Sequence, residues 1–100
     1  MGSLLDIKGL SNMVSGICDV ARDKNTNQKT IDELVVLTAD IYNTGAYCFD
    51  FGGVSISYFA FAALKWVNTQ YSIEQFDNLF NALPYERKER INKIITDYPV

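Results

Sequence analysis

One hundred residues provide enough chain for one domain and too little for two separate hydrophobic cores. Apolar residues make up 48% of the chain and charged residues 21%, which is typical of a globular protein rather than a disordered or fibrous one. Nine Lys and Arg against twelve Asp and Glu give a net charge of −3. This charge argues against non-specific binding to the phosphates of a nucleic acid. We therefore expect a single compact domain over residues 1–100.

The chain contains no histidine, so it lacks the commonest general base and the commonest metal ligand. Its two cysteines, Cys18 and Cys48, are too few for a zinc site built from cysteine pairs. Their apolar neighbours favour two reduced, buried thiols, and a single disulfide is the alternative. We expect no metal and no cofactor.

Nothing at the start of the chain has the pattern of a targeting segment. Asp6 interrupts the apolar residues that a signal peptide would need. The longest uncharged segment in the middle of the chain, residues 51–64, is short for a membrane span. The sequence therefore predicts a soluble, cytoplasmic protein.

The first predicted element is an amphipathic helix from about Ser3 to Ala21, where apolar residues recur at three- and four-residue steps. Gly9 and Gly16 are seven residues apart and would share one side of this helix. Each glycine costs roughly 1 kcal/mol relative to alanine in a helix interior. A closely packed partner backbone would offset this cost, and simple tolerance or a kink is the alternative.

The polar residues 22–29 predict a loop before the second helix. Thr30 and Glu33 have the spacing of a capping box, which places the helix start at Thr30. Gly45 suits a left-handed cap and would end the helix. The apolar face of this helix would consist of Leu34, Val35, Leu37, Ile41 and Tyr42.

Residues 47–58 alternate in polarity on both sides of Gly52-Gly53, which is the pattern of a β-hairpin with a tight turn. Aromatic and aliphatic side chains would occupy one face, and small or polar ones the other. The apolar face would contain Tyr47, Phe49, Phe51, Val54, Ile56 and Tyr58, and the other face Cys48, Asp50, Ser55 and Ser57. The alternative is an irregular loop that leads into a buried helix.

Residues 59–68 are almost entirely apolar and predict a central, buried helix. A capping box formed by Ser72 and Gln75 would begin the fourth helix. Pro84 suits the first position of the fifth helix. The expected fold is mainly α (an α+β protein), with about five helices and one central β-hairpin.

Catalysis is the least expected function. Asp32, Glu33 and Glu86 lie where acidic residues stabilise the first turn of a helix. Asp50 is the least explained carboxylate, and a solvated strand residue is the simpler interpretation. Gly52-Gly53 lacks the spacing of a phosphate-binding loop and the lysine that follows it. We therefore expect a protein that is not an enzyme.

Binding to DNA is the alternative function, because the helical pair over residues 72–97 has the general outline of a helix-turn-helix. Four basic residues occupy its second helix. They are Arg87, Lys88, Arg90 and Lys93. Acidic residues alternate with them, so the net charge of residues 84–97 is only +1. Such alternation is more typical of a solvated helix face.

Binding to another protein is the function that the sequence favours. Eight of the thirteen aromatic residues fall between Tyr42 and Trp66, and residues 30–64 contain four acidic residues and no Lys or Arg. Aromatic residues are enriched at interfaces, and an acidic surface favours a basic partner or a second copy. The candidate contact residues are Tyr47, Asp50, Phe51, Tyr58 and Trp66.

We therefore expect a non-enzymatic protein-interaction module that also self-associates, through the hairpin and the glycine-marked first helix. Small adaptor, immunity or inhibitor proteins of bacteria and phages fit this description. A small-ligand pocket between the hairpin and the central helix remains a further alternative.

Overall fold

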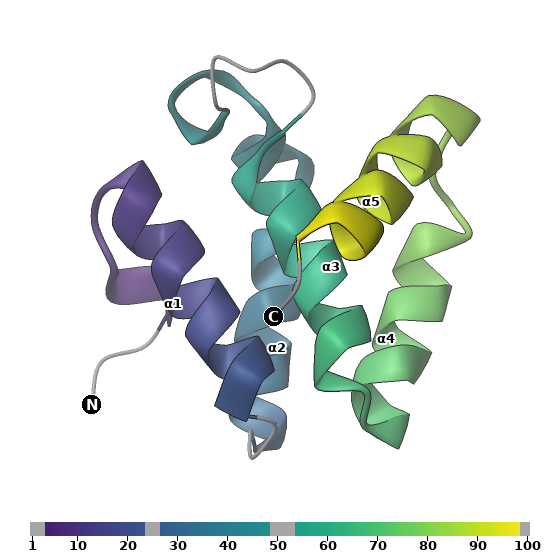
Figure 1. The fold of residues 1–100 in the computed structure, drawn as a ribbon, viewed down its shortest axis with the longest axis horizontal. Helices are drawn as coiled ribbons and strands as arrows, with labels where there is room; N and C mark the ends of the chain where they lie inside the picture. Colours follow the sequence, from purple (N-terminus) through teal and green to yellow (C-terminus); the bar gives the residue numbers. More distant parts are fainter. Residues whose placement is uncertain (1–3, 24–26, 49–53, 99–100) are drawn as a thin grey trace.

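A computed structural model describes residues 4–23, 27–48 and 54–98. Within these residues the chain forms five α-helices and three short 3-10 helices (Figure 1). The α-helices are α1 (Leu10–Asp23), α2 (Gln28–Leu37), α3 (Ile56–Val67), α4 (Gln70–Phe80) and α5 (Tyr85–Asp97). The 3-10 helices are η1 (Leu4–Asp6), η2 (Asp40–Asn43) and η3 (Gly45–Tyr47).

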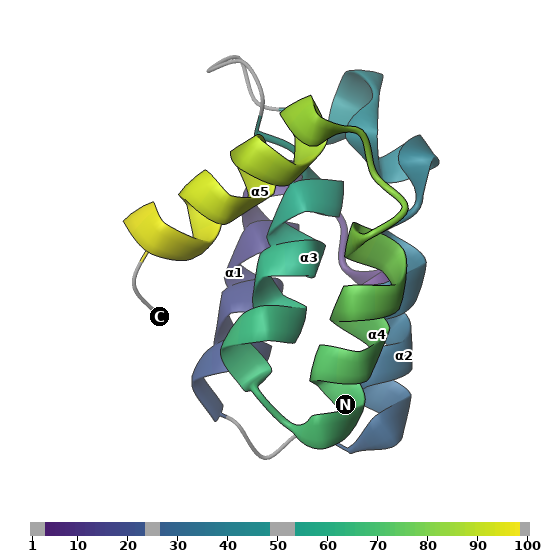
Figure 2. The same ribbon diagram turned by 90° about the vertical axis from the view of Figure 1, so that its right-hand side faces the viewer.

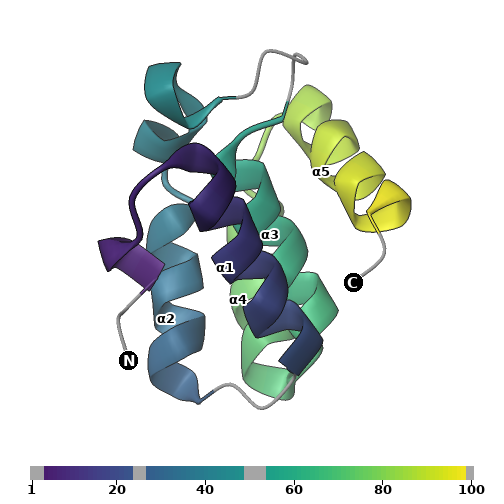
Figure 3. The ribbon, with the colours of Figure 1, turned by 60° about the vertical axis from the view of Figure 1, so that its left-hand side comes forward.

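Helix α3 is the centre of the fold, as its nearly all-apolar sequence predicts. Every residue from Ile56 to Leu64 is buried. Each of the other four α-helices packs more extensively on α3 than on any other α-helix. Helices α1 and α2 lie on one side of α3 in Figure 1, and Figure 3 shows α1 running along it. Helix α4 runs beside α3, and α5 lies across it (Figure 2).

The predicted β-hairpin is wrong, and the described part of the fold is all-α because it contains no β-strand. Ile56 and Tyr58, expected on the apolar strand face, belong to the first turn of α3. Ser55 and Ser57, expected on the polar face, are both buried. The side chain of Ser55 caps α3 by accepting a hydrogen bond of 3.3 Å from the backbone N–H of Tyr58.

The structure retains one short β-like contact in this region. Cys48 and Ser55 form an isolated antiparallel bridge. The turn expected at Gly52-Gly53 belongs to residues 49–53, which lie outside the described residues. The sequence offered a hairpin or a buried helix after Gly53, and the buried helix is the one that forms, beginning at Ile56.

The first helix is also shorter than predicted, because the chain bends before α1 begins. Gly9 has a φ of +92°, a backbone conformation that other residues rarely adopt. It separates η1 from α1 and therefore does not share a helix face with Gly16. A Cβ on Gly16 would lie 2.6 Å from Cδ1 of Ile7. The close neighbour of Gly16 is thus the chain's own N-terminal segment, folded back over α1.

Helix α2 begins one turn earlier than predicted. Asn27 is the N-cap, and its side chain accepts a 3.0 Å hydrogen bond from the backbone N–H of Thr30. The expected capping box of Thr30 and Glu33 does not form, because Glu33 Oε1 accepts the N–H of Leu4 instead, at 2.8 Å. This bond fastens η1 to α2.

Helix α2 also ends earlier than predicted, at Leu37, and two 3-10 helices follow it. Gly45 does adopt a left-handed conformation, with a φ of +46°, but it begins η3 rather than capping α2. The chain therefore leaves the helical axis at Thr38, and this departure creates the candidate site described below.

The last two helices lie close to their predicted positions. Helix α4 has a capping box one turn earlier than expected, in which Thr69 is the N-cap and Ser72 is its partner. Pro84 precedes α5 as its N-cap residue instead of opening its first turn. These shifts leave the number and order of the helices in this half as predicted.

Two findings concern the expected cellular setting. None of the helices in the described ranges has the length and apolar character to cross a membrane. Cys18 and Cys48 are both free thiols, and burial raises the pKa of Cys18 above its ordinary value. The disulfide alternative is therefore not formed in this structure, and the cytoplasmic location stays a prediction.

Candidate functional site

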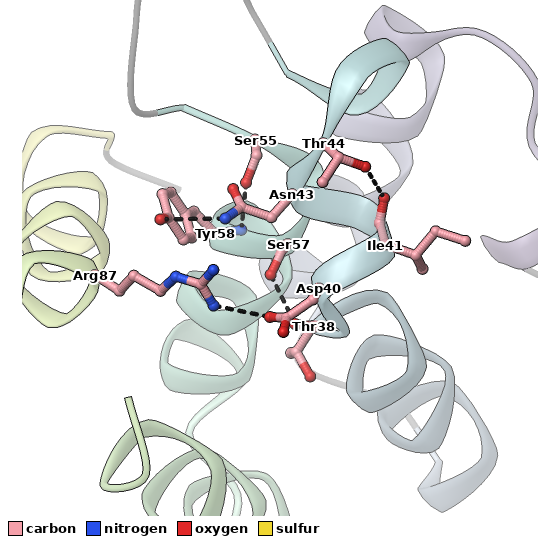
Figure 4. A network of polar contacts seen from close by, with 9 residues as sticks. All are labelled: Thr38, Asp40, Ile41, Asn43, Thr44, Ser55, Ser57, Tyr58 and Arg87. Carbon is pink, nitrogen blue, oxygen red and sulfur yellow. Dashed lines mark hydrogen bonds and ion pairs between the residues drawn. The ribbon is translucent and has the colours of Figure 1, made fainter. Parts of the chain in front are cut away.

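The candidate site is the segment of residues 38–44, called here the η2 segment, which connects the end of α2 to η3 (Figure 4). It packs against the start of α3 and approaches the first turns of α5. Polar side chains from both helices hold it, and it presents an aliphatic side chain at the surface.

The innermost contact joins the η2 segment to α3. The hydroxyl of Ser57 donates a hydrogen bond of 2.7 Å to the backbone carbonyl of Thr38, and both residues are buried. The hydroxyl of Thr38 donates in turn to the carbonyl of Val35, at 2.6 Å. A buried carbonyl without a partner would be costly, so these bonds fix the point at which the chain leaves α2.

A second contact holds the far end of the η2 segment. The amide of Asn43 donates to the hydroxyl of Tyr58, at 3.4 Å. The ring of Tyr42 packs edge-on against Tyr47, with ring centroids 4.9 Å apart. The hydroxyl of Thr44 donates to the carbonyl of Ile41 at 3.0 Å, which closes the turn on itself.

The third contact is an ion pair with α5. Arg87 Nη1 lies 2.8 Å from Asp40 Oδ1, which brings the start of α5 to the η2 segment. The carboxylate side chain of Asp40 is 82% exposed, so the pair is solvated and contributes at most about 1 kcal/mol. Its main effect is positional, because it gives the segment a contact on the side opposite to α2.

An exposed aliphatic surface lies on this framework. Ile41 is 65% exposed, and Val36, on the last turn of α2, is 47% exposed. Ala39, between them in the chain, is also exposed. In Figure 4 the side chain of Ile41 points away from Arg87 and from the polar contacts that hold its backbone. The site therefore combines a constrained backbone with apolar surface in contact with water.

Of the five residues expected from the sequence to contact a partner, the structure describes three, which differ in burial and in position. Tyr58 is buried, and Tyr47 is half-buried against Tyr42. Trp66 lies about two turns further along α3, half-buried, and its indole N–H donates to the carbonyl of Ile95 at 3.2 Å. The other two candidates, Asp50 and Phe51, lie outside the described residues.

Sequence reasoning did not single out Val36 and Ile41 as surface residues. Ile41 was assigned to the apolar face of a longer second helix, and it becomes exposed because that helix ends at Leu37. A signal was present at Val36, an aliphatic residue that falls outside the apolar face of its helix. Such a residue is either a surface contact or an unremarkable exposed side chain.

The basic residues of α5 do not assemble into one surface. Arg87 pairs with Asp40, and the ammonium group of Lys88 lies 5.8 Å from the ring centroid of Phe80. Arg90 and Lys93 remain exposed, next to Glu86 and Glu89. No feature of this arrangement favours the DNA-binding alternative.

Within the part of the chain that the structure describes, no group of three or more Cys, Asp or Glu side chains is placed to hold a metal ion. Comparisons with protein families, with curated proteins and with solved structures find no match to this chain.

Proposed function

We propose that this chain is a non-enzymatic protein-interaction module, of the adaptor, immunity or inhibitor type, that binds a protein partner through the η2 segment and the adjoining end of α2. The observation that carries the proposal is Ile41, which is 65% exposed on a backbone held by contacts to two helices. The absence of histidine supports binding rather than acid–base catalysis.

Preorganisation is the physical reason to regard this surface as a contact. Binding is weakened by the entropy lost when loops and side chains become ordered at an interface. The hydrogen bond from Ser57 to Thr38, together with the Arg87–Asp40 pair, orders the η2 segment before any partner arrives. Ile41 is also β-branched and has few rotamers to lose. Its aliphatic surface can therefore contribute to binding with little ordering cost.

The charges around the site favour a partner with an apolar pocket flanked by Lys or Arg. Asp40 lies in the η2 segment, Asp32 and Glu33 lie further back on α2, and residues 30–64 contain no basic residue, so Arg87 of α5 is the positive charge placed against Asp40. Asp40 accepts the hydrogen bond from Arg87 through Oδ1 alone, and its carboxylate can accept further hydrogen bonds. Complementary charge at the rim of an interface accelerates association and selects among partners.

The test begins with affinity capture by the immobilised protein from a lysate of the cells that encode it. Each captured protein is then purified, and its affinity is measured for the wild type, for Ile41→Ser and for Leu5→Ser. Leu5 is the matched control, because it is an aliphatic residue that is 44% exposed but lies on η1. We expect Ile41→Ser to weaken binding about tenfold or more, since burying such a side chain contributes roughly 1.5–3 kcal/mol.

The control variant Leu5→Ser should bind the same partner as tightly as the wild type. Equal affinities for the wild type and Ile41→Ser would show that the η2 segment is not the contact surface. A lysate in which no protein binds the purified chain would argue against the interaction module itself.

A further inference from the structure

The outer face of α5 is free of other α-helices. The helix packs on α3 through Ile91 and Ile94, which are buried, and its opposite side is turned away from the helical core (Figure 2). At 100° per residue, Glu89 and Lys93 lie near the middle of that outer side, opposite Ile91. A shallow depression follows this face, lined by Tyr85, Glu89, Asn92, Lys93, Thr96 and Asp97.

The charges on this face have a definite order. On this side of the helix Glu89 lies two residues before the central residue, Ile91, and Lys93 lies two residues after it. Among the described residues neither side chain takes part in an ion pair, although their spacing of four residues would permit it. Glu89 Oε1 instead accepts a 2.7 Å hydrogen bond from the hydroxyl of Tyr85. The face thus carries unpaired charge of both signs.

An antiparallel second copy complements this order. A twofold axis at the level of Ile91 places Glu89 of each copy opposite Lys93 of the other, so the same attractive pair forms twice. The axis also places the ring of Tyr85 opposite Asp97 of the other copy, while the tyrosine hydroxyl keeps its hydrogen bond to Glu89. In such a contact the same surface serves both partners. A parallel arrangement would instead bring like charges together and is disfavoured.

We propose that the outer face of α5 is a self-association surface, on which a second copy of this chain docks antiparallel through reciprocal Glu89–Lys93 pairs. Tyr85, 72% exposed at one end of the face, supplies the aromatic contact surface that interfaces favour. One pair of short helices buries less than the roughly 1,200 Å² of standard complexes. The dimer is therefore weak, and salt weakens it further because exposed charges hold it.

This proposal is independent of the function proposed for the η2 segment, because the two surfaces share no residue. Dimer formation would also place two η2 segments on one particle and strengthen binding to a partner with two sites. The inference replaces the expectation that a hairpin and the first helix mediate self-association.

Sedimentation equilibrium from micromolar to millimolar protein, in low and in high salt, tests the proposal. The variants are Glu89→Lys, Lys93→Glu and the double exchange of both residues. Each single reversal replaces two attractive pairs by two repulsive ones, and should raise the dimer dissociation constant about tenfold or more. The double exchange should restore association. Lys29→Glu, an exposed position on α2, makes the same charge change as Lys93→Glu and should leave the dimer unchanged.

A wild-type protein that stays monomeric at millimolar concentration in low salt would overturn the proposal. A double exchange that associates no better than the single reversals would do the same. Loss of self-association in Ile41→Ser would show that the copies meet at the η2 segment and not at α5.

Discussion

The hydroxyl of Ser57, on the first turn of α3, donates a 2.7 Å hydrogen bond to the backbone carbonyl of Thr38, nineteen residues earlier in the chain. Both residues are buried. Through this bond the start of the central helix determines where α2 stops and where the η2 segment begins. The exposure of Ile41 thus depends on a contact made inside the protein.

Replacing Ser57 by alanine should lower the free energy of unfolding by about 1–3 kcal/mol, because the carbonyl of Thr38 stays buried without its donor. Urea denaturation followed by circular dichroism measures the change. The matched control is Ser15→Ala, at an exposed position within α1. The control should be neutral or slightly stabilising, because alanine has the higher helix propensity. Equal stability of Ser57→Ala and the wild type would contradict the assignment.

Gly9→Ala should destabilise the protein by about 1–2 kcal/mol, the cost of placing a Cβ on a residue with positive φ. The cause is backbone strain, since the closest atom to a Cβ at this position is at an ordinary distance of 3.4 Å. The measurement compares the thermal unfolding midpoints of Gly9→Ala and Lys8→Ala. Lys8 is the exposed neighbour, so the difference reports the backbone strain at Gly9. A midpoint equal to that of Lys8→Ala would mean that the bend before α1 does not need glycine.

The contribution of Tyr71 to stability should disappear in alkaline solution. Its hydroxyl donates to Asp32 Oδ1 at 2.5 Å, and this hydrogen bond raises the pKa of Tyr71 above its ordinary value of 10. Because the pKa is higher in the folded state, the stabilisation is complete below pH 10 and is lost as the pH rises through the folded pKa. Urea denaturation of the wild type and Tyr71→Phe, on both sides of pH 10, measures this difference.

Below pH 10 the wild type should be the more stable of the two proteins, and the gap should close at higher pH. Tyr85, whose pKa is also raised by its hydrogen bond to Glu89, is present in both proteins, so its effect cancels in the comparison. A gap that does not change with pH would show that Tyr71 and Asp32 do not interact in solution.

The C-terminal half of the fold was predictable because its signals are local. The apolar residues 59–68 are stable only when they are buried in a core. Pro84 indicates the start of a helix, because proline lacks the N–H that a helix interior requires. The capping box was misplaced by one turn because Thr69 and Ser72 are both good N-caps. In the structure Thr69 is the N-cap, and the hydroxyl of Ser72 accepts a 2.9 Å hydrogen bond from the backbone N–H of Thr69.

The hairpin was wrongly predicted because the segment from Val54 to Tyr58 is too short to separate a period of two from the helical period. Ser55 and Ser57 resemble the outward residues of a strand. In the structure Ser55 caps α3 and Ser57 donates to Thr38, so each hydroxyl is satisfied in the interior. Ser57 and Thr38 are nineteen residues apart in the chain, and such a long-range contact has no local sequence signal.

The candidate site was not predictable for the same reason. Ile41 fits the apolar spacing of a second helix that continues past Thr38. In the structure this helix ends at Leu37, where the hydroxyl of Ser57 binds the carbonyl of Thr38. The interface role expected of Trp66 stays a prediction. No sequence signal indicated its contact inside the chain, where the indole N–H donates to the carbonyl of Ile95.

The central position of α3 has a consequence for protein synthesis. Helices α1 and α2 precede α3 in the chain, and each has its largest packing surface on it. Until Val67 has left the ribosome, the faces that contain Ile17 and Leu34 have no surface to cover them. The first half of the nascent chain therefore emerges with its largest apolar faces uncovered, and the packing of α1 and α2 on the central helix begins only when that helix is complete.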